Sequence, residues 1–116
     1  MNLITKTNGN TRVIIIHGDV DLYNAQELRD IIHNQADSGI KSLILSFKNV
    51  SYIDSSGIGS LLHIIRTAWA MKIRIAFADL TEPVMNLIEL TKLRTFFPIA
   101  ETMEDALTMV LSGEEK

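Results

Sequence analysis

The chain has 116 residues, and its 47% of hydrophobic residues is enough to build the packed core of one domain. Its 11 basic and 14 acidic residues are mixed along the sequence and sum to a net charge of −3. This pattern excludes the basic surface of a protein that binds nucleic acid or an anionic membrane, and it favours a protein as the partner. The absence of cysteine excludes a disulfide framework, thiolate catalysis and zinc sites built on sulfur.

The N-terminal segment predicts a β-hairpin followed by a helix. Residues 3–6 and 11–16 are extended runs, and the Asn8-Gly9 pair between them is preferred in tight hairpin turns. From residue 24 to 37, apolar side chains recur at helical spacing on one face, and Gly39 follows as a left-handed cap. That face consists of Ala25, Leu28, Ile31, Ile32 and Ala36.

Two strands and a long helix are predicted in the middle of the chain. Residues 42–47 form a short, mostly apolar run, typical of a central parallel strand that is covered on both faces. A polar loop then leads into a helix that extends to about Met71, and residues 73–78 predict another strand. The side chains on apolar faces are interpreted as core, among them Phe47, Phe77 and Trp69.

The C-terminal third predicts two helices with a short strand between them. Thr81 supplies a capping hydroxyl, and a proline lies in the first turn of a helix that carries Val84, Leu87, Ile88 and Leu90. Residues 96–99 predict the last strand. Thr102 with Asp105 resembles a capping box at the start of the final helix.

Strands and helices alternate after the hairpin, which predicts an α/β fold: one mixed sheet, parallel in its centre, with about four helices packed on it. We expect a single domain over residues 1–116, with an ordered core of about 2–111 and frayed residues 112–116. The first residues lack a secretory pattern, and no stretch approaches the roughly 20 apolar residues that a membrane span needs. We therefore expect a soluble, cytoplasmic protein.

The segment DSSGIG at residues 54–59 lies between two apolar segments and consists mostly of small polar residues and glycines. Helix capping explains one of these residues, because Asp or Ser at a helix N-terminus accepts hydrogen bonds from free backbone N–H groups. Capping needs neither two adjacent hydroxyls nor two glycines, each of which costs roughly 1 kcal/mol relative to alanine inside a helix. Since glycine lets a backbone or a phosphate approach closely, the segment is a candidate site as well as a candidate cap.

Three motifs cover nearly the whole chain: GDVD with NAQELR at 18–29, VSYIDSSGIG at 50–59, and LIELTKL at 87–93. Together they resemble the STAS domains (sulphate transporter and anti-sigma factor antagonist), most closely the free-standing anti-sigma factor antagonists. The middle motif is the specific one, because the family's phosphorylated serine directly follows the aspartate at the head of the second helix. That position is Ser55, and Ser56 stands where the family usually has a second Ser or Thr. Lys92 departs from the glycine that relatives often have.

The resemblance implies a partner switch with no catalytic activity, metal or cofactor of its own. Unmodified, such a protein binds an anti-sigma factor and releases the sigma factor. The anti-sigma factor, itself a serine kinase, then phosphorylates the antagonist and the two separate, and a metal-dependent serine phosphatase resets the switch. The family places the loop after the second strand beside the phosphoacceptor. The candidate partner-binding residues are therefore Asp19, Asp21, Asp54, Ser56, Gly57 and Gly59.

The same loop has a plain structural interpretation. Asp19 and Asp21 are then solvated turn residues, with Asp21 or Asn24 capping the first helix, while Leu22 and Tyr23 anchor the loop on the core.

A phosphate on the serine at the helix N-terminus adds about −1.5 to −2 charges, which the helix macrodipole tolerates. We therefore expect modification to leave the fold intact.

Two other classes of function stay open. One is a STAS module without a phosphorylation cycle in a transport system or sensory scaffold, because fold alone does not assign function. The other is a small enzyme, for which the sequence shows no G-x-S-x-G nucleophile elbow, P-loop lysine or recognisable catalytic triad. His17, His33 and His63 lie on separate predicted elements without metal-ligand spacing, so we expect no metal site.

Overall fold

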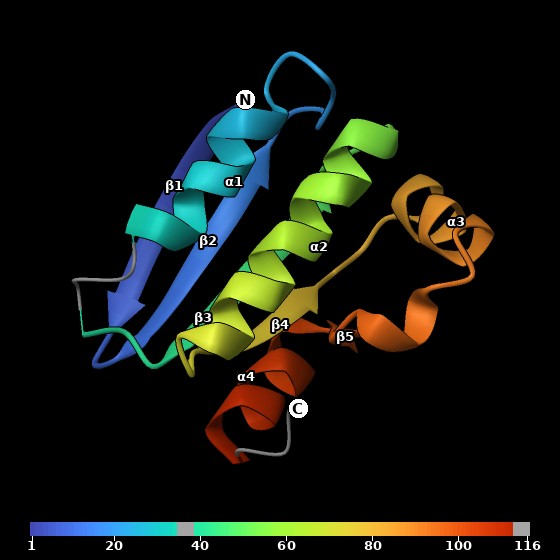
Figure 1. The fold of residues 1–116 in the computed structure, drawn as a ribbon. Helices are drawn as coiled ribbons and strands as arrows, with labels where there is room; N and C mark the ends of the chain where they lie inside the picture. The colour runs from blue at the N-terminus through green and yellow to red at the C-terminus, as the bar shows by residue number, and fades with distance from the viewer. Residues whose placement is uncertain (35–38, 113–116) are drawn as a thin grey trace.

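The structure, a computed structural model that describes residues 1–34 and 39–112, is built on one mixed sheet in the order β1-β2-β3-β4-β5 (Figure 1). The first pair of strands is antiparallel and the others are parallel, which confirms the predicted hairpin and parallel centre. The strands are β1 (Asn2–Asn8), β2 (Thr11–His17), β3 (Ser42–Asn49), β4 (Arg74–Ala78) and β5 (Ile99–Ala100).

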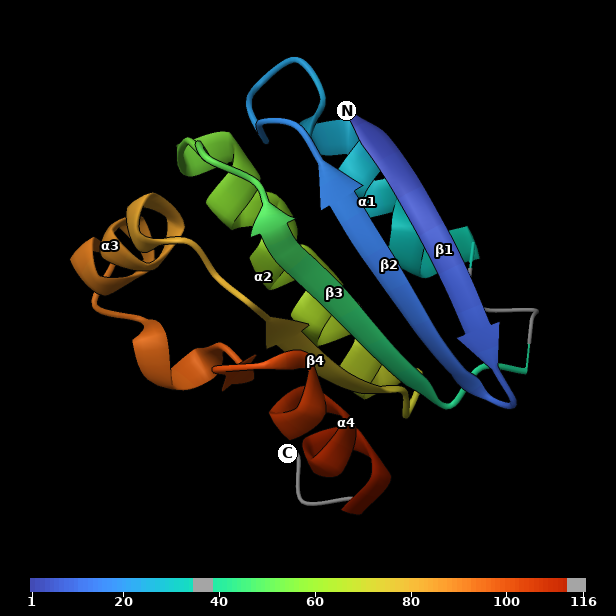
Figure 2. The same ribbon diagram turned by 180° about the vertical axis from the view of Figure 1, so that it is seen from behind.

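Four α-helices pack on this sheet, as predicted. Helices α1 and α2 lie side by side on one face, α4 covers the opposite face, and α3 lies beyond the β4 side of the sheet (Figures 1 and 2). None of the described helices is both long and apolar enough to cross a membrane. The helices are α1 (Ala25–Asn34), α2 (Ser55–Ala70), α3 (Glu82–Leu90) and α4 (Met103–Ser112), with a short 3₁₀ helix η1 (Arg94–Phe96).

The core has two parts because β3 is covered on both faces. Its first six residues are buried, which confirms the predicted central strand. The larger part of the core lies between the sheet and the α1/α2 layer and contains Phe47 and Phe77, whose ring centroids are 5.2 Å apart. The smaller part lies under α4. Trp69 is 36% exposed at the side of α2, so its assignment to the core was wrong.

The hairpin turn falls one residue later than predicted. Asn8 pairs with Thr11, which leaves Gly9 and Asn10 as a two-residue loop. Gly9 has a φ of +63°, whereas Asn10 is not among the described non-glycine residues with positive φ. A glycine at the first central position is the pattern of a type II′ turn, so the positive φ is needed at one residue and not at both.

The start of α3 differs from its prediction. The Thr81 hydroxyl donates to the Val50 carbonyl oxygen at 2.7 Å and makes no capping bond within the described chain. Pro83 lies in the first turn, as predicted. Leu90 belongs to the helix, as predicted, but its side chain is 75% exposed. The hydroxyl thus ties α3 to the end of β3 instead of capping its own helix.

The predicted last strand is shorter, because Phe96 belongs to η1 and only two residues pair with β4. The Asp105 N–H donates to Thr102 Oγ1 at 3.1 Å, which confirms one half of the predicted capping box. Gly39 has a φ of +77°, as expected for a left-handed cap. Ser112 is still helical, while the predicted helical residues 35–37, including Ala36, and the frayed residues 113–116 lie outside the described residues.

Candidate functional site at the N-terminus of α2

The carboxylate of Asp54 joins the start of α2 to the loop that follows β2. Asp54 is the N-cap, and its Oδ1 accepts a hydrogen bond from the Gly57 N–H at 3.0 Å. Its Oδ2 accepts from the Leu22 N–H at 3.1 Å. One oxygen therefore satisfies a free N–H of the helix, which confirms the capping interpretation, and the other holds a loop 32 residues away in sequence.

Backbone pairing holds the same loop in place. Val20 forms an isolated parallel bridge with Ile53, in which the Val20 N–H donates to the Tyr52 carbonyl oxygen at 3.0 Å and the Asp54 N–H donates to the Val20 carbonyl oxygen at 3.1 Å. The Ser51 hydroxyl adds a bond of 3.2 Å to the Asp19 carboxylate. The loop with Asp19 therefore lies beside the start of α2, as the resemblance implied.

Asp21 and Asn24 form a reciprocal pair that stabilises the turn before α1. Asp21 Oδ1 accepts from the Asn24 N–H at 3.2 Å, and Asn24 Oδ1 accepts from the Asp21 N–H at 2.9 Å. This is the geometry of a capping box. The Asn24 side chain also donates to the Asp19 carbonyl oxygen at 2.7 Å. Asp21 and Asn24 are therefore residues of the turn that leads into α1, and their bonds set the shape of the loop.

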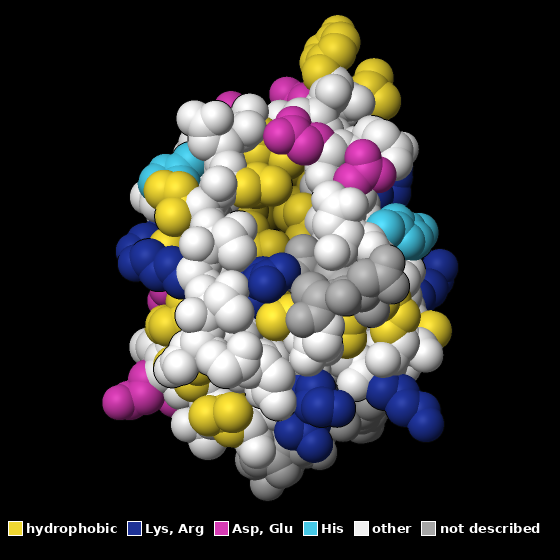
Figure 3. All heavy atoms as spheres, turned by 90° about the vertical axis from the view of Figure 1, so that its left-hand side faces the viewer, with side chains coloured by type: hydrophobic (Ala, Val, Ile, Leu, Met, Phe, Trp, Pro, Cys, Tyr) yellow, Lys and Arg dark blue, Asp and Glu magenta, His cyan; other side chains and the backbone are white. Residues whose placement is uncertain are grey.

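That shape directs two hydrophobic side chains outward. Leu22 is 68% exposed and Tyr23 is 94% exposed, so the prediction that they anchor the loop on the core was wrong. The fully buried Val20 is the anchor. Tyr52, which the sequence analysis did not single out, is 52% exposed on the neighbouring segment. Figure 3 shows hydrophobic side chains projecting at this end of the molecule, with acidic side chains just below them.

We call this region the loop–helix surface, and it contains Asp19, Asp21, Leu22, Tyr23, Tyr52 and Ser55. Its serine is the most accessible hydroxyl at the start of α2. Ser55 is the first helical residue and is exposed, Ser56 is half-buried, and Ser60 is buried. The Ser60 hydroxyl lies 3.1 Å from the carbonyl oxygens of Ala25 and Ser56 and accepts a bond from Arg29. Among the described residues, the Ser55 side chain has no hydrogen-bond partner.

The two glycines of α2 differ in their surroundings. Gly57 is buried, and a Cβ there would clash with Cγ1 of Ile53 and lie 2.9 Å from Cγ1 of Val20. Gly57 therefore lets the helix pack directly on the Val20–Ile53 bridge. Gly59 is exposed, and a Cβ there would meet no described atom within 4 Å. Close approach of a binding partner can therefore explain the glycine at position 59, whereas the glycine at position 57 is explained by packing inside the molecule.

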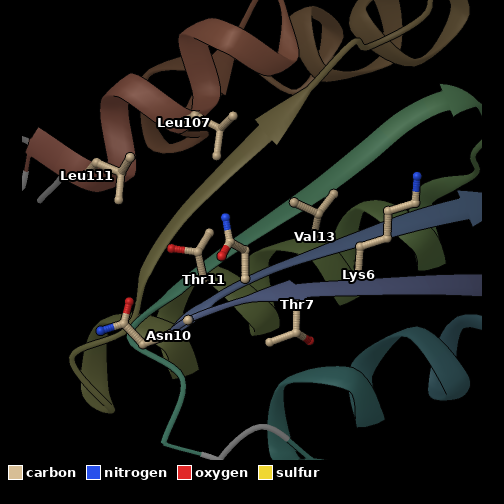
Figure 4. Close-up of a pocket in the computed structure, with 9 residues that line it drawn as sticks. Lys6, Thr7, Asn10, Thr11, Val13, Leu107 and Leu111 are labelled. Carbon is tan, nitrogen blue, oxygen red and sulfur yellow. The ribbon is translucent and has the colours of Figure 1, made fainter.

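A pocket and a pair of histidines lie outside this surface. A pocket lined by Thr11, Val13, Leu107 and Leu111 lies between the hairpin turn and α4 (Figure 4). The described part of the chain holds no group of three or more His, Cys, Asp or Glu side chains that could bind a metal. His33 and His63 lie on separate helices, as predicted, yet their Nε2 atoms are 3.1 Å apart. Helix packing, which spacing within one element does not reveal, brings them together.

Comparisons with known proteins agree with this architecture. A Thermotoga maritima structure, solved as that of a candidate anti-sigma factor antagonist, superposes with a TM-score of 0.84 at 19% identity, over 94% of each chain. The anti-sigma factor antagonist SpoIIAA in its unphosphorylated form has a TM-score of 0.77 at 23% identity, over 96% of this chain and 97% of that one. The phosphorylated form of this Bacillus cell fate determinant has a TM-score of 0.68 at 22% identity, over 92% and 97% of the two chains.

Sequence comparison gives the same result. The anti-sigma-B factor antagonist of Bacillus subtilis is 28% identical over 104 residues, which are 90% of this chain and 94% of the relative. The family model for the STAS domain matches residues 2–106. This match includes the whole sheet, the first three helices and the loop–helix surface. The protein therefore belongs to the STAS domain family.

Proposed function

We propose that this chain is an anti-sigma factor antagonist that works as a phosphorylation-controlled partner switch in the cytoplasm. The unphosphorylated form binds an anti-sigma factor that is also a serine kinase, and a sigma factor is released. Phosphorylation on Ser55 separates the two proteins, and a metal-dependent serine phosphatase restores the first state. The match to the Bacillus subtilis anti-sigma-B factor antagonist supports the class of partner, and SpoIIAA, solved in both phosphorylation states, supports the type of switch.

The observation that carries the proposal is the exposed, unpartnered hydroxyl of Ser55 beside a loop that Asp54 holds in place. A kinase must bring the acceptor hydroxyl in line with the γ-phosphate, which requires an exposed side chain on a well-positioned backbone. Ser55 meets both conditions because it is exposed and is the first residue of α2, directly after the capping residue Asp54. Ser60 fails the first condition because it is buried and hydrogen-bonded.

The surroundings of Ser55 suit a contact surface rather than an active site. Leu22, Tyr23 and Tyr52 present hydrophobic area, and aromatic side chains of this kind dominate the energetics of many interfaces. Asp19 and Asp21 add negative charge but are held in hydrogen bonds of the loop. The kinase supplies ATP and the catalytic groups, so the antagonist needs no catalytic residue, cofactor or metal of its own.

Phosphorylation ends the complex through charge at the contact. The active site of a kinase carries acidic groups around the acceptor hydroxyl, and a phosphate left there is repelled by them. One charge about 7 Å from an acidic group costs roughly 2 kcal/mol at an effective dielectric constant of 20, so two charges cost about 5 kcal/mol. Because 1.4 kcal/mol is tenfold in affinity, such a cost exceeds about a thousandfold.

The proposal is tested by incubating the protein with its cognate anti-sigma factor kinase and ATP and locating the phosphate by peptide mass spectrometry. We expect one phosphate, on Ser55. The Ser55→Ala variant should resist phosphorylation and stay bound to the kinase, whereas the matched variant Ser56→Ala should be phosphorylated like the wild type. Phosphate found mainly on Ser56 or Thr67 would overturn the assignment.

A further inference from the structure

Two histidines from neighbouring helices meet outside the loop–helix surface. His33 lies in the last turn of α1, and His63 lies in α2. Their Nε2 atoms are 3.1 Å apart, their ring centroids are 5.2 Å apart, and the ring planes are inclined by 49°. His33 is exposed and His63 is half-buried, so the pair is open to solvent. The pair therefore bridges α1 and α2, which lie side by side (Figure 1).

The separation of the two nitrogens suits a metal ion as well as a proton between them. Bonds from zinc to imidazole nitrogen are about 2.0–2.1 Å long, so two of them span about 2.9 Å at a right angle and about 3.4 Å at the tetrahedral angle. The observed 3.1 Å lies between these values. Without a metal, the same contact is an N–H···N hydrogen bond in which one ring carries its proton on Nε2.

We propose that His33 and His63 form a binding site for a divalent transition metal ion of the Zn²⁺, Ni²⁺ or Cu²⁺ type, which clamps α1 to α2. Imidazole nitrogen suits these ions, whereas Mg²⁺ and Ca²⁺ require oxygen ligands. Water completes the coordination, because the site is open. Both Nε2 lone pairs are used, so the proton on one Nε2 moves to Nδ1 of the same ring, and no group is oxidised or reduced.

Two electrostatic features near the pair bear on cation binding: the guanidinium of Arg29 and the C-terminal end of α1. Arg29 lies one turn before His33, but its guanidinium is held by Ser60 Oγ at 3.0 Å and by Gln26 Oε1 at 2.6 Å. The C-terminal end of a helix carries partial negative charge, which favours a cation at the last turn of α1. Two protein ligands give a weaker site than a closed four-ligand zinc centre. The inference is independent of the phosphorylation switch, because neither histidine belongs to the loop–helix surface.

The test is isothermal titration of the protein with ZnCl₂ and with NiCl₂ after removal of any polyhistidine tag. We expect one metal ion per chain and a higher Tm in its presence. His33→Gln and His63→Gln should each weaken binding about tenfold or more, because one of two ligands is lost.

His17→Gln is the matched control, because His17 lies on β2 next to Asn49 and away from the pair. This variant should bind metal as the wild type does. Melting each variant without metal shows that the fold is intact, so that a loss of binding reports the ligand. Equal affinity of wild type, His33→Gln and His63→Gln would overturn the proposal, as would wild-type binding weaker than about 1 mM.

Discussion

The packing at the start of α2 is tested most directly by the substitution Gly57→Ala. A Cβ at this position would clash with Ile53 and lie 2.9 Å from Val20, and both side chains are buried, so neither can turn into solvent. Overpacking of a core costs about 1–3 kcal/mol, whereas alanine is favoured over glycine inside a helix by only about 1 kcal/mol. Because the added Cβ would lie closer to Ile53 and Val20 than Cβ atoms lie to any neighbour in real structures, the upper half of the overpacking range applies. We therefore expect the free energy of unfolding to fall by about 1–2 kcal/mol.

The matched variant is Gly59→Ala, whose Cβ meets no described atom within 4 Å and which should gain up to about 1 kcal/mol from helix propensity. Urea denaturation followed by circular dichroism measures both changes. In thermal melting, 1 kcal/mol corresponds to about 4–8 °C for a domain near this size. A Gly57→Ala variant as stable as the wild type, or two variants that shift in the same direction, would refute the packing argument.

Three further substitutions test other parts of the molecule. Tyr23→Ala should leave the Tm unchanged, because the side chain is 94% exposed, but weaken binding of the anti-sigma factor about tenfold or more in surface plasmon resonance. Thr81→Val removes the bond to the buried Val50 carbonyl and should lower the free energy of unfolding by about 1–3 kcal/mol in urea. Ser55→Asp should melt like the wild type and bind the partner less tightly than Ser55→Ala. Equal affinity of those two variants would contradict the charge mechanism.

The sheet and its helices were predictable because their signals are local. The first six residues of β3 are mostly apolar, and only a strand covered on both faces buries every residue of such a run. α2 follows a capping aspartate and then repeats apolar residues at helical spacing. The position of Ser55 at the head of this helix was therefore predictable too, since Asp54 marks the boundary.

The remaining features depend on tertiary contacts that local patterns do not contain. In the loop after β2, three apolar residues follow one another within four positions, and only the bridge to Ile53 decides that Val20 is buried while Leu22 and Tyr23 are exposed. His33 and His63 meet because of how α1 packs against α2. The hydroxyl of Thr81 has a carbonyl partner from a distant segment, which outweighs its local capping role.

Asp54 shows how a structural residue can prepare a surface for regulation. Its two oxygens hold the first turn of α2 and the loop in one arrangement, and the Ser60 contacts with Ala25 and Arg29 join the two helices below. A surface that is already ordered loses little conformational entropy on binding, which favours affinity. Ser55 lies on this surface with its hydroxyl free of the described bonds, so a phosphate breaks none of them. We therefore expect phosphorylation to change the charge of the surface while its backbone stays in place.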